Sequence, residues 1–305
     1  MIGVWRSLVA YSLGVRVVGR SNRLTPTTES KRKGGHLFGH LFLSARFCSN
    51  NYMVILVSND DGIHSEGLLC LEKVLSAVGK VYTVAPDKEQ SASSHSLTLH
   101  RPLRINNVGP TRFSVDGTPT DCINLAVKGF LPVRPDLVVS GINKGPNLGD
   151  DVTYSGTVAA AFEASLLGIP ALAVSLVAFD APYHFQAAAE FAAMMAKKIG
   201  SQEQSTKTLL NINVPNRTRD KIRGYRFTKQ GKRRYGDKME VRHDPRGKKY
   251  YWIGGDNLGF EPIDGSDCVA VDEGYISVTP LRTDFTDDSA LKLVGQIEVP
   301  WSQEG

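Results

Sequence analysis

From residue 53 onward, short apolar runs alternate with segments whose apolar residues recur at helical spacing. The runs are continuous, as in VILVS at 54–58 and DLVVS at 136–140. Continuous apolar runs are typical of parallel strands that are buried on both faces, and strands that alternate with helices favour a sheet covered by helices. The sequence therefore predicts an α/β fold with a mostly parallel sheet flanked by helices.

Start and stop signals bound the predicted elements. Ser65 and Gly79 enclose one helical segment, and Thr118 followed by Pro119 supplies an N-cap and a first-turn proline for another. We expect strands at 53–58, 81–85, 136–140, 171–176, 208–215 and 274–279, and helices at 65–78, 118–129, 155–167, 184–199 and 289–295.

The residue composition of the chain changes near residue 216. Stretches such as RGYRFTKQGKRRYGD and GKKYYWIGGDN mix charged, aromatic and glycine residues, which indicates hairpins and extended arms. We therefore divide the chain into a leader (1–52), a core (53–215) and a C-terminal hairpin and arm region (216–305). A basic cluster in the last part favours a solvated hairpin over a phosphate or nucleic-acid contact, and consists of Lys229, Lys232, Arg233 and Arg234.

The leader carries most of the positive charge. Residues 1–52 hold eight Lys and Arg against one acid, Glu29, whereas the remaining residues carry 28 basic and 30 acidic side chains. The body is thus close to neutral and shows no electrostatic signature of nucleic-acid binding. Arginines interrupt the apolar stretches of the leader, so that no membrane span is predicted. The leader is either a transit-like segment without an ordered core, or not native protein because translation starts at Met53.

Cysteine usage indicates the compartment. The four cysteines are far apart and form no CxxC pair, which favours buried thiols in a reducing compartment over disulfides or a zinc site. We expect a cytoplasmic protein, or one imported into an organelle if the leader is a genuine transit peptide.

Polar loops follow three of the predicted strands. SNDDG comes after the first strand, APDKEQSASS after the second, and SGINKGPNLGDDVTYSGT after the strand at 136–140. Ligands bind beyond the carboxyl ends of parallel strands, so these loops should converge. The adjacent carboxylates of Asp60 and Asp61 repel unless a cation compensates, and Ser91 and Asn143 offer neutral oxygens of the kind that Mg²⁺ or Mn²⁺ binds. Taken alone, Asp60 and Asp61 could instead cap turns or the following helix.

Other features of these loops allow two interpretations each. Ser155, Gly156 and Thr157 open a helix whose free N–H groups could bind an anion, or they form an ordinary serine N-cap. His64 and His95 could protonate a leaving group or contact substrate, but non-catalytic loop histidines are favoured. The acids at 150 and 151 are favoured as structural. No GxSxG or GxGxxG motif supports a serine hydrolase or a dehydrogenase.

These motifs together resemble the stationary-phase survival protein SurE family of metal-dependent nucleotidases. The resemblance covers residues 53–285 and is carried by ILVSNDDGI, VAPDKEQSASSHSLTL, VDGTPTDCI, PDLVVSGINKGPNLGDDVTYSGTVAAAFEA, LNINVP, DPRG, YWIG and VDEGYISVTPL. It implies a Rossmann-like core with a C-terminal arm that exchanges between subunits, and hence a homodimer or homotetramer. Its metal ligands correspond to Asp60, Asp61, Ser91 and Asn143, and its phosphate-binding residues to Asn59, Ser155, Gly156 and Thr157.

The leading hypothesis is a phosphatase that hydrolyses nucleoside monophosphates, as a 5′-nucleotidase, with 3′-nucleotides and short polyphosphate as further substrates implied by the resemblance. One Mg²⁺ or Mn²⁺ per subunit would activate the attacking water. Asp61 is expected to be a pure ligand, and Asp60 a ligand that also orients or deprotonates the water. No nucleic acid or membrane is expected as a partner. The alternatives are a non-catalytic nucleotide-binding regulatory protein that uses the same crevice, and a metal-dependent transferase.

Overall fold

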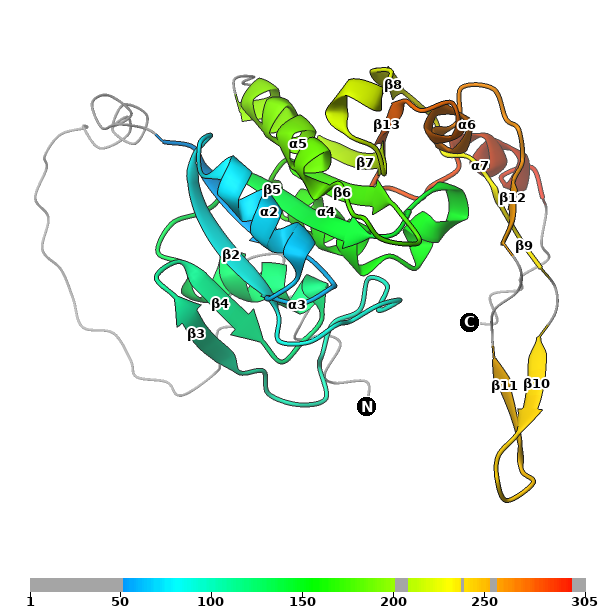
Figure 1. The fold of residues 1–305 in the computed structure, drawn as a ribbon, viewed down its shortest axis with the longest axis horizontal. Helices are drawn as coiled ribbons and strands as arrows, with labels where there is room; N and C mark the ends of the chain where they lie inside the picture. The colour runs from blue at the N-terminus through cyan, green and yellow to red at the C-terminus, as the bar shows by residue number, and fades with distance from the viewer. Residues whose placement is uncertain (1–51, 201–207, 237–238, 253–256, 298–305) are drawn as a thin grey trace, which may run out of the picture. The chain divides into compact units, whose positions relative to one another are not determined.

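The computed structural model describes residues 52–200, 208–236, 239–252 and 257–297. The strands of its main sheet are β1 (Val54–Ser58), β2 (Lys80–Pro86), β3 (Ile105–Gly109), β4 (Arg112–Val115), β5 (Leu137–Lys144), β6 (Ala171–Val177), β7 (Leu209–Pro215), β8 (Tyr225–Phe227) and β13 (Ile276–Pro280). They are ordered β3-β4-β2-β1-β5-β6-β7-β13-β8 (Figure 1). Strands β4 to β7 in this order run parallel, whereas β3 and β13 run antiparallel to β4 and β7. The predicted α/β fold is confirmed.

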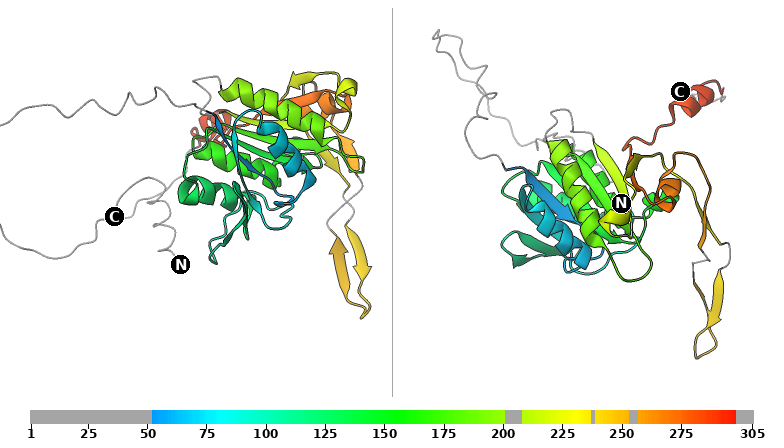
Figure 2. Two further views of the ribbon diagram at one scale, coloured as in Figure 1. Left: turned by 60° about the vertical axis from the view of Figure 1, so that its left-hand side comes forward. Right: turned by 45° about the horizontal axis from the view of Figure 1, so that its top comes forward.

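Helices cover both faces of the sheet (Figure 2). On one face α2 (Glu66–Leu75) packs beside α5 (Phe185–Gly200). On the other face lie α3 (Pro119–Leu125), which continues into a π-helical turn at Ala126–Phe130, and α4 (Gly156–Leu166). The first turn of each covering helix therefore lies at the edge where the parallel strands end.

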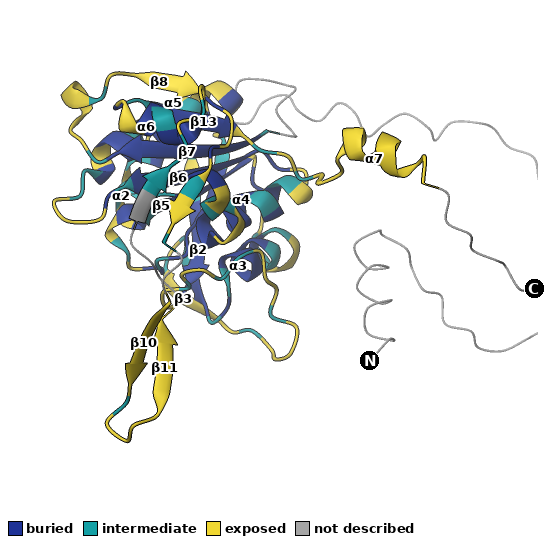
Figure 3. Ribbon diagram, turned by 90° about the vertical axis from the view of Figure 1, so that its right-hand side faces the viewer, coloured by how far each residue is buried: buried dark blue, intermediate teal, exposed yellow. Residues whose placement is uncertain are grey.

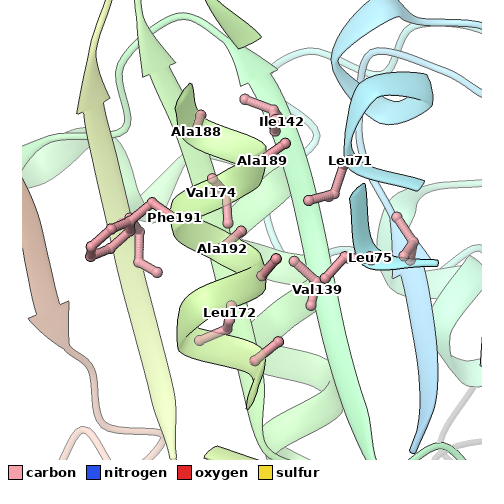
Figure 4. Close-up of a cluster of buried hydrophobic side chains, with 14 of the residues drawn as sticks. Leu71, Leu75, Val139, Ile142, Leu172, Val174, Ala188, Ala189, Phe191 and Ala192 are labelled. Carbon is pink, nitrogen blue, oxygen red and sulfur yellow. The ribbon is translucent and has the colours of Figure 1, made fainter. Parts of the chain in front are cut away.

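The pleat of β1 explains why both faces are covered. Ile55 and Val57 belong to the apolar cluster under α2 and α5, whereas Leu56 belongs to the cluster under α3 and α4. Figure 4 shows the first cluster, in which Leu71 of α2 and Ala192 of α5 point toward the sheet. Burying each large aliphatic side chain of this kind stabilises the fold by about 1.5–3 kcal/mol.

Strand β5 is longer than the sequence predicts, because it continues past Ser140 to Lys144. It remains paired with β6 as far as Lys144, and only glycine fits at position 141, where φ is +133° and a Cβ would lie 2.2 Å from the carbonyl oxygen of Val174. The register with β6 shifts between Gly141 and Asn143. A β-bulge therefore turns Asn143 at the end of the strand.

The residues after 216 extend the same sheet through β13 and β8 and also form separate hairpins. The remaining strands are β9 (Arg233–Tyr235), which pairs with β12 (Asn257–Phe260), and β10 (Glu240–His243), which pairs with β11 (Lys249–Trp252). The remaining α-helices are α6 (Asp267–Asp272) and α7 (Asp288–Val294). The side chains of β10 and β11 are exposed (Figure 3). The predicted hairpin is therefore present, while the division at residue 215 stays a prediction.

One buried carboxylate joins the C-terminal part to the core. Asp267 is fully buried, and it accepts hydrogen bonds from the N–H groups of Gly149, Gly231 and Cys268. Three donors compensate the desolvation of the charge.

The leader prediction lies outside the described residues. Within the described part of the chain, no helix is long and apolar enough to cross a membrane.

Candidate active site

The three polar loops meet at the carboxyl ends of neighbouring strands. β1 lies between β2 and β5, and Ser58 pairs in register with Ser140. The N–H of Gln90 donates to the carbonyl of Asp60 at 2.7 Å, which ties the loop after β2 to the loop after β1. The N–H of Lys144 donates to Asp61 Oδ2 at 3.2 Å, which ties the end of β5 to the same loop. The predicted convergence of the loops is thus observed.

Asp60 lies against the first turn of α4. The Thr157 hydroxyl donates to Asp60 Oδ1, and the N–H groups of Gly156 and Thr157 also interact with the carboxylate. Burial nevertheless raises the pKa of the Asp60 carboxyl above its ordinary value, because the loss of hydration outweighs these donors. Asp60 therefore places its charge at the positive end of a helix that begins 96 residues later in the chain, and not at the helix that follows it.

Asp61 carries a second partly buried carboxylate beside the first. Burial and, next, the Asp60 charge raise the pKa of Asp61 to about 6, although the N–H of Lys144 acts in the opposite direction. Positive charge placed between two adjacent carboxylates with raised pKa values favours their ionised forms. The pair therefore has the electrostatic character of a cation site.

Asn143 and Ser91, which are the predicted neutral ligands, each donate a hydrogen bond within the protein. Asn143 Nδ2 donates to the carbonyl of Gly145 at 3.0 Å, which leaves the carboxamide oxygen to bind another group. Ser91 is exposed, and its hydroxyl donates to Glu89 Oε1 at 2.5 Å. This bond uses the hydroxyl hydrogen, so that the lone pairs of Ser91 Oγ remain able to bind a cation.

The donor set fits a hard divalent cation, because it consists of oxygens alone. Among the described residues, no group of three or more His, Cys, Asp or Glu gathers in a way that could hold a metal ion. A cation at this edge would therefore need neutral oxygens such as that of Asn143 in addition to the two carboxylates. Which of the four predicted residues bind it stays a proposal.

The predicted phosphate contacts already have partners in this structure. Ser155 caps α4, since its Oγ accepts the N–H of Val158 at 3.0 Å. Asn59 is fully buried, and its Nδ2 donates to the carbonyl of Gly62 at 3.1 Å and to Ser65 Oγ at 2.7 Å. Both amide hydrogens of Asn59 are thus committed to the turn after β1, whereas its side-chain oxygen Oδ1 has no partner among the residues that the structure describes.

A family model described as Survival protein SurE matches residues 55–237. The chain belongs to the SurE family. The protein named 5′-nucleotidase SurE from Syntrophotalea carbinolica is 49% identical over 253 residues, which are 83% of this chain and 100% of that protein. Its namesake from Geotalea daltonii is 50% identical over 247 residues, or 81% and 100%. The SurE crystal structure from Aquifex aeolicus is 41% identical, with a TM-score of 0.72, and covers 79% of this chain and 98% of that chain. The resemblance found in the motifs is confirmed.

This SurE chain also has site residues that the sequence does not single out. Asn147 is buried within the loop after β5, and its Nδ2 donates to Ser175 Oγ at 2.7 Å. The amides of Asn211 and Asn213 on β7 both donate to the carbonyl of Asn147, at 2.8 and 3.0 Å. Asparagines at alternate positions of a buried strand are a signal that could have marked this network, because each needs a polar partner. The network fixes the loop that follows Asn143.

The two loop histidines lie in different surroundings. Both are exposed, but His95 Nε2 also lies 2.7 Å from Glu163 Oε2 of α4, and its ring meets Phe162 edge-on at 5.1 Å. Asn124 also donates to Glu163, at 2.7 Å. The contacts of His95 fasten the loop after β2 to α4.

Proposed function

We propose that this chain is a divalent-metal-dependent phosphatase that hydrolyses nucleoside monophosphates and acts as a 5′-nucleotidase. The observation that carries the proposal is the pair of adjacent carboxylates, Asp60 and Asp61, both with a raised pKa, at the sheet edge that faces the first turn of α4. Relatives named 5′-nucleotidase SurE, at 49–50% identity over most of this chain, support the same activity.

The cation, Mg²⁺ or Mn²⁺ at one per subunit, would be held by oxygens of Asp60, Asp61, Ser91 and Asn143. When bound, it supplies positive charge that polarises the phosphoryl group and activates a water for in-line attack. Asp60, whose carboxylate is the more deeply buried, is suited to orient that water and to accept its proton. Asp61 serves as a ligand only.

The phosphoryl group would bind at the first turn of α4. The first turn of α4, from Ser155 to Thr157, presents N–H groups and the positive end of the helix dipole. Because Asp60 shares these donors in the present structure, substrate must approach beside the carboxylate and not replace it. Asn59 then acts by holding the turn that carries Asp60, through its bonds to Gly62 and Ser65.

Phosphate release from nucleotides tests this proposal directly. The full-length protein is incubated with AMP, GMP, 3′-AMP, short polyphosphate and a chromogenic phosphate monoester, with Mn²⁺ or Mg²⁺ and then with excess EDTA. We expect release of phosphate from the 5′-nucleotides with either cation and loss of release in EDTA, restored by added cation. Tight nucleotide binding without release would instead identify a regulatory protein, and transfer of the phosphoryl or sugar group to a second substrate would identify a transferase.

We further propose that the β10–β11 hairpin contacts other copies of this chain in a homodimer or homotetramer. A two-stranded hairpin is marginally stable in water when nothing covers its apolar side chains. Val241 and Tyr251 face each other across this hairpin and are 49% and 57% exposed. Burial against another subunit would remove this apolar surface from water.

Introducing charge into the hairpin tests the oligomer. We expect the double variant Val241→Asp and Tyr251→Asp to lower the molar mass in light scattering at micromolar concentration, because two buried carboxylates oppose association. Lys248→Asp, in the exposed turn of the same hairpin, is the matched control and should leave the mass unchanged. A double variant that keeps the mass of the wild type contradicts the proposed contact.

A cytoplasmic location is proposed as well, because Cys70, Cys122 and Cys268 carry free thiols, as is usual in reducing compartments. Amino-terminal sequencing of the native protein would show whether the leader is present, removed on import or never translated.

A further inference from the structure

Ser93 has a hydroxyl oxygen that is buried and that has no hydrogen-bond partner in the described part of the chain. Buried polar atoms are nearly always paired, so an unpaired hydroxyl beside a candidate active site needs an explanation. Two other serines in this part of the sheet, Ser58 at the end of β1 and Ser140 within β5, share the property, but both residues are fully buried. Ser93 differs from them in that the residue is partly exposed, on the loop after β2.

The hydroxyl of Ser93 points at the first turn of α4. A Cβ placed on Gly156 would lie 2.8 Å from Ser93 Oγ and 2.9 Å from Asp60 Oδ2. The two oxygens therefore lie close to the same point above the Gly156 backbone, without a hydrogen bond between them. This point lies beside the Thr157 hydroxyl, which donates to Asp60 Oδ1.

The backbone around Ser93 is fixed in this position. The N–H of Ser94 donates to the carbonyl of Tyr154 at 3.2 Å, and Ser94 Oγ donates to the carbonyl of Thr153 at 2.7 Å. Ala92 and Ser94, on either side of Ser93, have φ values of +56° and +54°, in the left-handed region that residues other than glycine rarely adopt. The fold therefore maintains an unfavourable backbone conformation that aims Ser93 at α4.

Ser93 also differs from Asn59 and Thr157 in that its hydroxyl hydrogen bonds to no acceptor among the described residues. Both amide hydrogens of Asn59 and the hydroxyl hydrogen of Thr157 already bond to protein acceptors. A phosphoryl oxygen that binds at the first turn of α4 accepts hydrogen bonds and cannot donate them. Ser93 is thus a side-chain donor that can bond to this oxygen without breaking a bond within the protein.

We propose that Ser93 binds the substrate by donating its hydroxyl hydrogen to a non-bridging phosphoryl oxygen of the nucleotide. The inference rests on the proposed nucleotidase function and adds to it a residue that recognises the phosphoryl group, distinct from the four proposed metal ligands. Inorganic phosphate, the product, presents the same oxygens and should bind to Ser93 in the same way.

The test compares Ser93→Ala with the wild-type full-length protein in two measurements. One is kcat/KM for AMP with Mn²⁺, and the other is a calorimetric titration with inorganic phosphate in the presence of Mn²⁺, which needs no turnover. We expect both kcat/KM and phosphate affinity to fall by roughly 10- to 100-fold, the loss expected for one hydrogen bond to a charged group. Mn²⁺ affinity should stay within twofold, and the melting temperature should not fall, because the hydroxyl bonds to no protein atom.

Two further variants keep the test decisive. Ser76→Ala, whose exposed hydroxyl bonds to the carbonyl of Lys73 far from this sheet edge, is the matched control and should bind phosphate as the wild type does. Ser93→Cys keeps the size of the side chain and weakens the donor. If Ser93→Ala is unstable, a loss of phosphate affinity in Ser93→Cys supports the proposal, and wild-type affinity overturns it.

The outcomes separate this inference from the function on which it rests. Wild-type affinity for phosphate in Ser93→Ala, together with normal turnover, overturns the role of Ser93 and leaves the nucleotidase standing. A wild-type protein that releases no phosphate from any nucleotide overturns the nucleotidase. In that case the calorimetric comparison still decides whether Ser93 contacts a phosphoryl oxygen.

Discussion

Asp61→Asn is expected to abolish phosphate release and, at the same time, to stabilise the metal-free protein. The proposed cation would lose one of its two charged ligands, so turnover should fall below about one thousandth of the wild-type rate. The fold should gain stability, because burial and the Asp60 charge raise the pKa of the wild-type Asp61 carboxyl to about 6. Asparagine keeps an oxygen that can accept the N–H of Lys144 and carries no charge.

The gain in stability should depend on pH in a defined direction. A carboxyl whose pKa is higher in the folded than in the unfolded protein destabilises the fold as it ionises. For Asp61 this penalty is absent below about pH 4, grows up to about pH 6 and is complete at pH 7, where it amounts to about 2–3 kcal/mol. Calorimetry of the metal-free protein should show a melting temperature about 5 °C higher for Asp61→Asn at pH 7, and no gain near pH 4.

Asp150→Asn is the control for this prediction, because Asp150 is an exposed carboxylate in the loop after β5. It should change neither turnover nor melting temperature. Normal turnover in Asp61→Asn would remove Asp61 from the metal site. A melting temperature that falls at pH 7 would show that the carboxylate stabilises the metal-free fold and would contradict the electrostatic account.

Gly156→Ala should disable the enzyme through a single methyl group. The new Cβ would lie 2.8 Å from Asp60 Cβ and 2.8 Å from Ser93 Oγ, closer than such atoms approach in proteins. Asp60 must then move away from Thr157, and a shift of this kind at a reacting group costs about 100-fold in rate. Stability should change little, because alanine favours the helix by about 1 kcal/mol relative to glycine and offsets part of the strain.

Gly129→Ala gives a matched comparison for the change at Gly156. A Cβ at Gly129 meets no atom within 4 Å, and the residue does not have a positive φ. We expect wild-type kcat/KM in this variant and a loss in Gly156→Ala, measured with AMP under the same conditions. Equal activity of the two variants would mean that the close packing of Asp60 on α4 is not needed for catalysis.

Much of the fold could be predicted from patterns, and the exceptions have physical reasons. The apolar runs locate β1, β2, β6 and β7 to within two residues, because each strand is buried on both faces. The hairpin of β3 and β4 was missed, since INNVG lies at the edge of the sheet with exposed side chains and shows no apolar pattern. The six residues of α6 are too few to show a period. The glycine at position 141 favours the start of a loop in the sequence. In the structure the strand instead continues through a bulge there and stays paired with β6.

The site could be predicted at the level of loops, but not of individual hydrogen bonds. The rule that ligands bind beyond the carboxyl ends of strands brings Asp60, Asp61, Ser91 and Asn143 to one edge. It cannot show that the Thr157 hydroxyl bonds to Asp60, or that the Ser91 hydroxyl is held by Glu89. Such bonds depend on side-chain positions that tertiary packing sets. For the same reason, the free hydroxyl of Ser93 was found only in the structure.

The neighbouring positions of Asp60 and Asp61 give the proposed cation a mechanical role. Asp60 is held by the first turn of α4, whereas Asp61 is held by the backbone at the end of β5. A cation bound by both would therefore join a helix on one face to the strand beneath it. Its affinity would then depend on the spacing between helix and sheet, so that any distant change which moves α4 relative to β5 would alter how much metal the protein retains.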